Sequence, residues 1–191
     1  MRRGTEPEPS IRKKGECDGD AEGRVEDGFV PEGDALFALL SESTAWDTRM
    51  RARWTASFGV PYNYSGVTYP LAPVPEPVAA VMERLAVRVG WRPNNCLANF
   101  YLDGASTMGF HADSTDELEP GTGVAVVSLG AERAITFRAA ANMSVTGEFP
   151  LRCGSLPHMT AELQAGWEHA ILRRPGAGGR VSLTFRRLKG G

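Results

Sequence analysis

Six short runs of β-forming residues follow Gly90 and decide the fold: CLANFYL (96–102), VAVVSLG (124–130), AITFRAA (134–140), LRCGSLP (151–157), WEHAIL (167–172) and RVSLTFR (180–186). Glycine, proline and acidic residues separate them. Several short strands with few helical patterns between them are typical of antiparallel β-sandwiches and barrels. The second half of the chain therefore predicts a β-sandwich or jelly roll.

Two helical patterns precede these runs. Residues 34–43 (DALFALLSES) place their leucines on one helical face, with Asp34 near the N-cap position. A second helix is predicted to open at the prolines of residues 75–89, where apolar residues recur at spacings of three and four and Gly90 follows as a stop. Between the two, residues 46–69 are rich in aromatics and arginines, interspersed with Gly59, Pro61 and Gly66, which predicts strands and loops.

The N-terminal segment differs in composition from the rest. Residues 1–34 contain 6 Lys/Arg and 10 Asp/Glu, whereas residues 35–191 contain 15 and 13. The beginning of the chain has almost no large apolar side chains, so ordering it would cost more entropy than burial returns. We therefore predict a disordered acidic tail at residues 1–28 and a single domain at residues 29–191.

The composition also bears on location. No stretch approaches the roughly 20 apolar residues of a membrane helix, and no apolar segment follows the first arginines as in a signal peptide. We expect a cytoplasmic protein without a membrane partner. The three cysteines, Cys17, Cys96 and Cys153, lie far apart and are expected to be buried free thiols.

A candidate metal site begins with Phe110-His111-Ala112-Asp113. In a strand, alternate side chains share a face, so His111 and Asp113 can present a ring nitrogen and a carboxylate oxygen toward one point. His169 lies in the later apolar run 167–172. Two histidines and one carboxylate suit non-haem iron(II) with open positions, although zinc hydrolases use the same ligand types and a simple His-Asp hydrogen bond would explain the short motif.

The run 180–186 favours the iron interpretation. Its alternation places Arg180, Ser182, Thr184 and Arg186 on one face and the apolar residues on the other. Guanidinium groups pair with carboxylates in a bidentate manner, and a dicarboxylic co-substrate offers one carboxylate at each end. The alternative for this strand in isolation is an exposed edge with solvated arginines.

The order of these motifs resembles the AlkB family of iron- and 2-oxoglutarate-dependent dioxygenases. The resemblance covers about residues 29–187. The matching segments are PYNYSG (61–66), NFY (99–101), Asp103-Gly104, HAD (111–113), SLG (128–130), TFR (136–138), GSL (154–156), WEH (167–169) and RVSLTFR (180–186).

The resemblance implies an α+β domain with a double-stranded β-helix (jelly-roll) core and N-terminal helices packed on one sheet. It implies Fe(II), 2-oxoglutarate and O2 as cofactor and co-substrates. His111, Asp113 and His169 would bind iron.

The resemblance also assigns the co-substrate residues. Arg180 would pair with the distal carboxylate of 2-oxoglutarate, assisted by Tyr101, while Arg186 and Asn99 would lie toward its 1-carboxylate. The implied reaction is oxidative demethylation of N-alkylated bases in DNA or RNA. We expect the enzyme to be a monomer and its nucleic-acid substrate to be single-stranded or nucleotide-sized.

For the substrate, Tyr62 and Tyr64 resemble positions that line the pocket for an extruded base. The repair enzymes carry an acidic residue a few positions after H-x-D, where this chain has Thr115 followed by Asp116. The body of the chain is only slightly basic, a weak footprint for duplex DNA. Two alternatives remain: a hydroxylase or demethylase of a small molecule or protein side chain, and a non-catalytic sensor or binding module.

Overall fold

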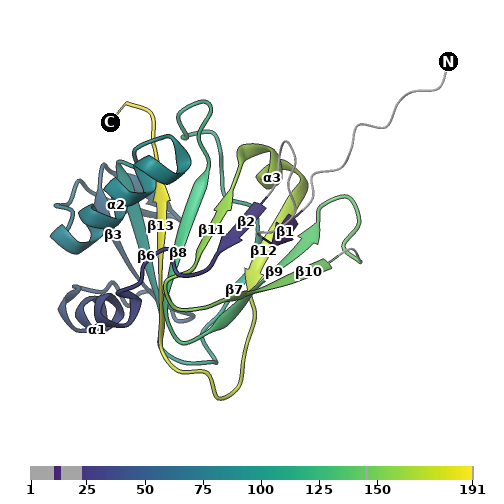
Figure 1. Ribbon diagram of the computed structural model, residues 1–191, viewed down its shortest axis with the longest axis horizontal. Helices are drawn as coiled ribbons and strands as arrows, with labels where there is room; N and C mark the ends of the chain where they lie inside the picture. The colour runs from purple at the N-terminus through teal and green to yellow at the C-terminus, as the bar shows by residue number, and fades with distance from the viewer. Residues whose placement is uncertain (1–10, 14–22, 145, 191) are drawn as a thin grey trace.

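The computed structural model describes residues 11–13, 23–144 and 146–190, and it contains two β-sheets packed against each other (Figure 1). The larger sheet has the strand order β1-β2-β11-β8-β13-β6-β3. Its strands are β1 (Ile11–Lys13), β2 (Gly23–Glu26), β3 (Trp54–Gly59), β6 (Asn95–Tyr101), β8 (Val124–Gly130), β11 (Leu156–Met159) and β13 (Arg180–Arg186). Only the β1–β2 pair is parallel within these described strands.

The smaller sheet has the order β10-β9-β12-β7. Its strands are β7 (Met108–His111), β9 (Arg133–Ala139), β10 (Thr146–Leu151) and β12 (Trp167–Ile171). A separate hairpin joins β4 (Tyr62–Tyr64) to β5 (Val67–Tyr69). Both residues of its turn, Ser65 and Gly66, have positive φ, which matches the right-handed twist of a two-residue hairpin.

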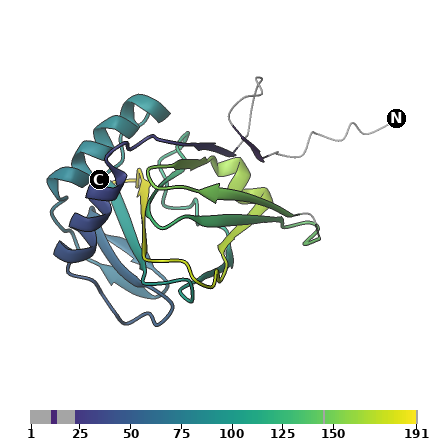
Figure 2. The same cartoon turned by 60° about the horizontal axis from the view of Figure 1, so that its bottom comes forward.

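Helices α1 (Gly33–Ser43) and α2 (Glu76–Val89) cover the outer face of the larger sheet, as Figures 1 and 2 show together. Apolar residues of both helices form one buried cluster with alternate residues of the central strands. From β13 this cluster receives Val181, Leu183 and Phe185, all 0% exposed. The prediction of an α+β jelly roll with N-terminal helices on one sheet is confirmed.

The inner face of the larger sheet has a different character. Apolar residues such as Leu97, Ile135 and Phe137 pack between the two sheets. The alternate residues of β13 also lie on this side, and they are polar: Arg180, Ser182, Thr184 and Arg186 are all buried. The alternation predicted for residues 180–186 therefore separates an apolar outer layer from a polar inner one.

The helix boundaries follow the expected local chemistry. Pro75 precedes α2, and Gly90 ends it in the left-handed conformation at φ 79°. The N-cap of α1 is Glu32, which makes no side-chain capping bond. Asp34 lies in the first turn of α1 and not at the cap. Its negative charge in the first turn interacts favourably with the helix dipole.

Regular structure begins earlier in the chain than the composition predicted. Gly23–Glu26 forms β2 and pairs with β11, although the composition predicted ordered structure only from Phe29. Val25 packs against the inner cluster, and Glu26 forms an ion pair with Arg88 of α2. These contacts are long-range, so composition gave no sign of them. The rest of the predicted tail, apart from residues 11–13 and 23–28, lies outside the described residues.

Two local predictions in the second half were also wrong or incomplete. The run 151–157 is not one strand, because β10 ends at Leu151 and β11 begins at Leu156. Gly154 separates them at φ 78°, where a Cβ would lie 2.2 Å from the carbonyl oxygen of Val30. The short helix α3 (Ala161–Gly166) was not predicted, because six residues are too few to show a helical period.

Two further expectations concern cysteines and membrane helices. Cys96 is a buried free thiol and Cys153 a half-buried one, while Cys17 lies outside the described residues. Within the described residues, no helix is long and apolar enough to cross a membrane.

Candidate active site

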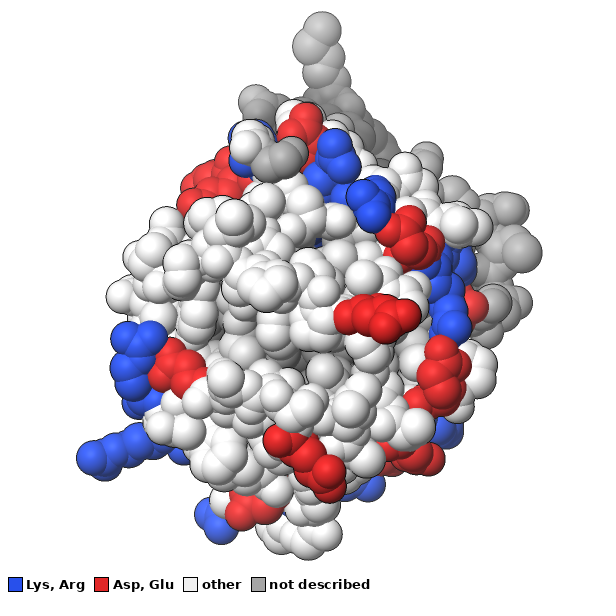
Figure 3. Space-filling view, turned by 90° about the vertical axis from the view of Figure 1, so that its left-hand side faces the viewer, with Lys and Arg blue, Asp and Glu red and all other residues white. Residues whose placement is uncertain are grey.

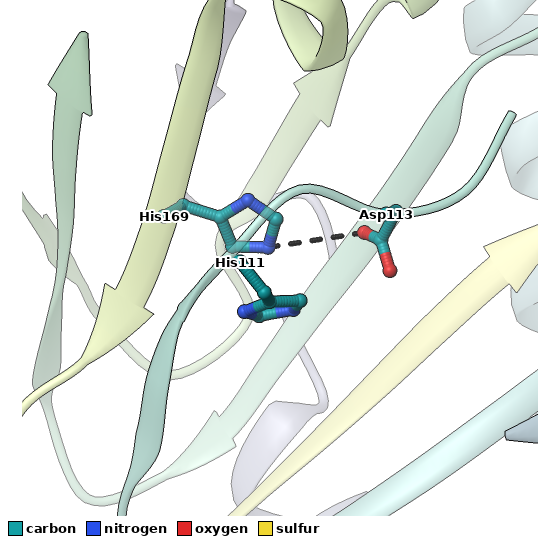
Figure 4. Close-up of side chains that lie close together, drawn as sticks. All are labelled: His111, Asp113 and His169. Atoms are coloured by element: carbon teal, nitrogen blue, oxygen red, sulfur yellow. Dashed lines mark ion pairs between the residues drawn. The ribbon is translucent and has the colours of Figure 1, made fainter. Parts of the chain in front are cut away.

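Three side chains predicted to bind metal come together between the sheets. His111 ends β7, His169 pairs with it from β12, and Asp113 lies two residues beyond the end of β7. One possible ligand atom from each lies within 4.8 Å of the others, and Figure 4 shows the three side chains converging. Asp113 was expected to share a strand with His111, and the structure corrects this: the carboxylate projects from the loop that follows.

Both imidazoles are suited to hold a cation. The Nδ1 atom of His111 lies 2.9 Å from the carbonyl oxygen of Gly109. A carbonyl only accepts, so Nδ1 carries a proton and Nε2 is the ring nitrogen that remains available to a metal. Burial lowers the pKa of His169 to about 4 in spite of the opposing charge of Asp113. His169 is therefore neutral at neutral pH and offers its Nε2 lone pair.

Asp113 supplies the negative charge of the cluster. Burial by itself would raise its pKa, but the charges of Arg186, His169 and His111 together bring the pKa below its ordinary value. The shortest contact joins Arg186 Nη2 to Asp113 Oδ1 at 2.6 Å. The other oxygen, Oδ2, lies 3.8 Å from His169 Nε2. A donor set of two imidazoles and one carboxylate fits a divalent first-row metal.

A cavity adjoins this cluster. The polar part of its lining consists of Tyr64, Asn99, Tyr101, Ser182, Thr184, Arg180 and Arg186, together with the three candidate ligands. The predicted metal and co-substrate residues thus border one space.

The two arginines of β13 are buried and only partly bonded. Arg180 is 1% exposed, donates from Nε to Ser128 Oγ at 2.8 Å and lies over the ring of Tyr101. Its Nη1, and the Nε and Nη1 atoms of Arg186, have no hydrogen-bond partner among the described residues. Buried charged donors without partners are costly, so an anion in the cavity would compensate them.

Arg53 is a site residue whose place the sequence did not reveal. Its side chain points inward from the loop before β3. Its Nε donates to Asn99 Oδ1 at 2.9 Å, and its Nη2 donates to the hydroxyl of Tyr64. It therefore connects the β4–β5 hairpin to the inner strand β6.

Two other contributors were missed. Gln164 of α3 bonds both the backbone and the carboxylate of Asp113. Arg133 is 0% exposed and donates to the backbone carbonyls of Asp103, Ser106 and Leu172. Thr160 caps α3 by accepting a hydrogen bond from Leu163 N. A threonine is a favoured N-cap residue, and it is the sequence signal from which this helix could have been predicted.

The predicted substrate residues lie in three different settings. Tyr64 lines the cavity. Tyr62 is buried, with the guanidinium of Arg186 4.9 Å from its ring centre, and it is not among the residues that line the cavity. Thr115 is half-buried and Asp116 exposed in the loop after Asp113, and neither lines the cavity.

Comparison with known proteins supports a family assignment. Residues 40–186 match the model of the 2OG-Fe(II) oxygenase superfamily. The chain is 34% identical over 145 residues to DNA oxidative demethylase ALKBH2 of Mus musculus, covering 68% of this chain and 58% of that protein. The Homo sapiens protein of the same name is also 34% identical, over 142 residues, with 53% of its length covered. The chain thus spans little more than half the length of these relatives.

The fold has a match among solved structures as well. The structure of OsALKBH1 superposes with a TM-score of 0.67, covering 85% of this chain and 96% of that one. The sequence identity is 17%, so this likeness concerns the fold alone.

Proposed function

Because the chain is an AlkB-family member of the 2OG-Fe(II) oxygenase superfamily, we propose that it is an iron(II)- and 2-oxoglutarate-dependent dioxygenase that dealkylates nucleobases oxidatively. One observation carries the proposal: two histidines and a carboxylate border the same cavity as two buried arginines with unbonded N–H groups. This pairs a metal site with a receptor for a dianion. The relatives named DNA oxidative demethylase ALKBH2 favour an alkylated base as substrate.

In this proposal His111, Asp113 and His169 hold iron(II). When bound, the metal supplies the oxidising chemistry that couples conversion of 2-oxoglutarate and O2 into succinate and CO2 to oxidation of a substrate C–H bond. The residues of the chain bind and orient. Arg186 fixes Oδ1 of Asp113, which leaves Oδ2 on the side of His169.

Arg180 is proposed to bind the far carboxylate of 2-oxoglutarate. It is buried, its Nη1 lacks a partner among the described residues, and Ser128 holds its Nε so that the guanidinium faces the cavity. Tyr101 lies beside it, with the guanidinium 5.0 Å from the ring centre. Asn99 and the free donors of Arg186 would then serve the 1-carboxylate end.

The charge of the surface supports a substrate with a small footprint, single-stranded or nucleotide-sized. Exposed arginines are largely paired with carboxylates of the chain itself. The pairs are Arg49–Asp47, Arg84–Glu32, Arg88–Glu26, Arg92–Glu83, Arg152–Asp27 and Arg174–Glu132. Figure 3 shows a face whose centre is uncharged, with acidic and basic side chains interspersed around it. A continuous basic surface is what duplex binding uses.

The proposed substrate contacts divide between cavity and loop. Tyr64 borders the cavity and is held by Arg53, so its ring can stack on a base. Tyr62 would position Arg186 and Tyr64, because its ring packs against the guanidinium of Arg186 and stacks on the ring of Tyr64. Thr115 and Asp116 would meet parts of the substrate that stay outside the cavity. A monomer located in the cytoplasm completes the proposal.

Because most exposed arginines are paired with carboxylates of the chain itself, a second candidate function is hydroxylation or demethylation of a small molecule or a protein side chain. It needs no phosphate contacts, and its substrate would approach the same cavity. The two candidates share the metal and co-substrate residues and differ only in what approaches Tyr64.

One experiment tests both. The protein is loaded anaerobically with iron(II) and 2-oxoglutarate, oxygen is admitted with an N-methylated single-stranded oligonucleotide, and succinate and formaldehyde are followed together. His111→Ala serves as the blank. Coupled release of both products supports base dealkylation.

Other outcomes are equally informative. Succinate without formaldehyde, absent in the His111→Ala blank, keeps the dioxygenase and favours the second candidate. Neither product from folded, iron-loaded protein contradicts the catalytic proposal and leaves a binding role.

A further inference from the structure

Asp113 lies in a part of the chain that the sheets do not fix. Residues 112–115 belong to no helix or strand, and Ala112 and Ser114 on either side are exposed. Strand pairing orients His111 and His169, which face each other across β7 and β12. The carboxylate of Asp113 has no such constraint, so contacts from elsewhere must set its direction.

Gln164 makes two such contacts. Its Oε1 accepts a hydrogen bond from the backbone N of Asp113 at 3.0 Å. Its Nε2 lies 3.4 Å from Oδ2 of the same residue and donates to it. One side chain therefore holds both the main chain and the carboxylate.

The direction of the Gln164 amide follows from these partners. A backbone N–H only donates, so the amide atom that faces it must be the oxygen. The NH2 group then necessarily faces the Asp113 carboxylate, which only accepts when ionised. Reversing the amide would break both bonds.

Gln164 is itself firmly placed. It is 5% exposed, its backbone N donates to Thr160 O at 3.2 Å, and its Nε2 also approaches Met159 Sδ at 3.6 Å. Thr160 caps the helix by accepting from Leu163 N. A capped helix that buries Leu163 and Gln164 thus carries the amide to the loop from fifty-one residues away along the chain.

We propose that Gln164 is a positioning residue for the metal, acting through Asp113. Arg186 takes Oδ1 at 2.6 Å, and Gln164 fixes the loop backbone and steadies Oδ2, so that Oδ2 faces His169 Nε2. Partners of metal ligands commonly change metal affinity by 10- to 100-fold when removed. The inference rests on the proposed metal site.

The test measures binding of cobalt(II) alone, without co-substrate, to the full-length protein. We expect Gln164→Leu, which keeps the volume but makes no hydrogen bond, to weaken cobalt(II) binding about 10- to 100-fold. The visible absorption of the cobalt complex should change as well, because the carboxylate is no longer held in one orientation. Glu162→Gln, on the exposed side of the same helix, is the matched control and should leave both unchanged.

Two further variants keep the outcome decisive. Gln164→Asn retains the amide but withdraws it by one methylene, so we expect the same weakening of cobalt(II) binding. This variant provides the test if Gln164→Leu does not fold. Either folded variant that binds cobalt(II) as tightly as the parent, with the same spectrum, overturns the inference. Asp113→Ala separates the two proposals: unchanged binding in that variant would mean that the metal site itself is misassigned.

Discussion

The two faces of β13 are equally buried and chemically opposite. On the outer face, Val181, Leu183 and Phe185 are fully covered by the helices and neighbouring strands. On the inner face, Arg180 and Arg186 are 1% exposed, yet several of their N–H groups lack a partner among the described residues. Burial on the outer face lowers the free energy of the folded chain, whereas the inner face buries N–H groups without partners at a cost, which Asp113 offsets in part for Arg186. One strand therefore joins stability to function.

The largest effect is expected on the outer face. Leu183→Ala should lower the free energy of unfolding by about 2–5 kcal/mol, because it removes a fully buried side chain and leaves a cavity. Denaturant unfolding measures this. The affinity of the remaining folded protein for 2-oxoglutarate should not change, and Val87→Ala, at a 90% exposed position, is the control. A loss of co-substrate affinity in folded Leu183→Ala would show that the two faces are not separable.

The next largest effect should reverse this pattern on the inner face. Arg180→Met should weaken binding of 2-oxoglutarate by about 100-fold or more, since a buried charge-assisted pair with the ligand is lost. The free energy of unfolding without ligand should stay the same or rise, because an uncompensated buried cation is removed. Calorimetric titration and denaturant unfolding test the two statements. Arg173→Met, at an exposed arginine, should change neither.

The smallest of the three effects concerns pH and the metal-free protein. The pKa of His169 is about 4 in the folded chain and near 6.5 when unfolded, so the unfolded chain takes up its proton first. The stabilisation is complete above pH 6.5 and is lost as pH falls toward 4, by about 2 kcal/mol at pH 5. The lowered pKa of Asp113 adds a loss in the same direction at lower pH.

Urea unfolding in the presence of a chelator, at a series of pH values, measures the slope of the free energy of unfolding against pH. His169→Gln should flatten it between pH 6.5 and 5. An unchanged slope in that variant would mean that the pH dependence arises from other groups.

The sequence was sufficient wherever a local pattern carried the information. The prolines and Gly90 around α2, the alternation of residues 180–186 and the pair His111 and Asp113 each follow from residues near one another in the chain. His169, fifty-eight residues after His111, was identified by its place in an apolar run and by the family resemblance. The fold class followed from the same patterns. The family resemblance added roles that spacing alone left open.

What remained hidden depends on contacts between distant segments. Gln164 meets Asp113 across fifty-one residues, and Arg53 meets Asn99 across forty-six. Neither residue type is unusual at the surface, so no local signal distinguishes them. Strand β2 escaped prediction for the same reason, since its partner β11 lies far along the chain.

The central place of β13 has a consequence for synthesis. Its two neighbours, β6 and β8, are made long before it, and the larger sheet stays open between them until residue 186 has left the ribosome. The nascent chain must therefore keep two unpaired strand edges from associating with other chains during that interval. Arg180 and Arg186, which we propose to bind the co-substrate, arrive on the strand that closes the gap. Under that proposal, a chain that has not completed its core does not bind 2-oxoglutarate, and binding of the ligand reports on the completion of folding.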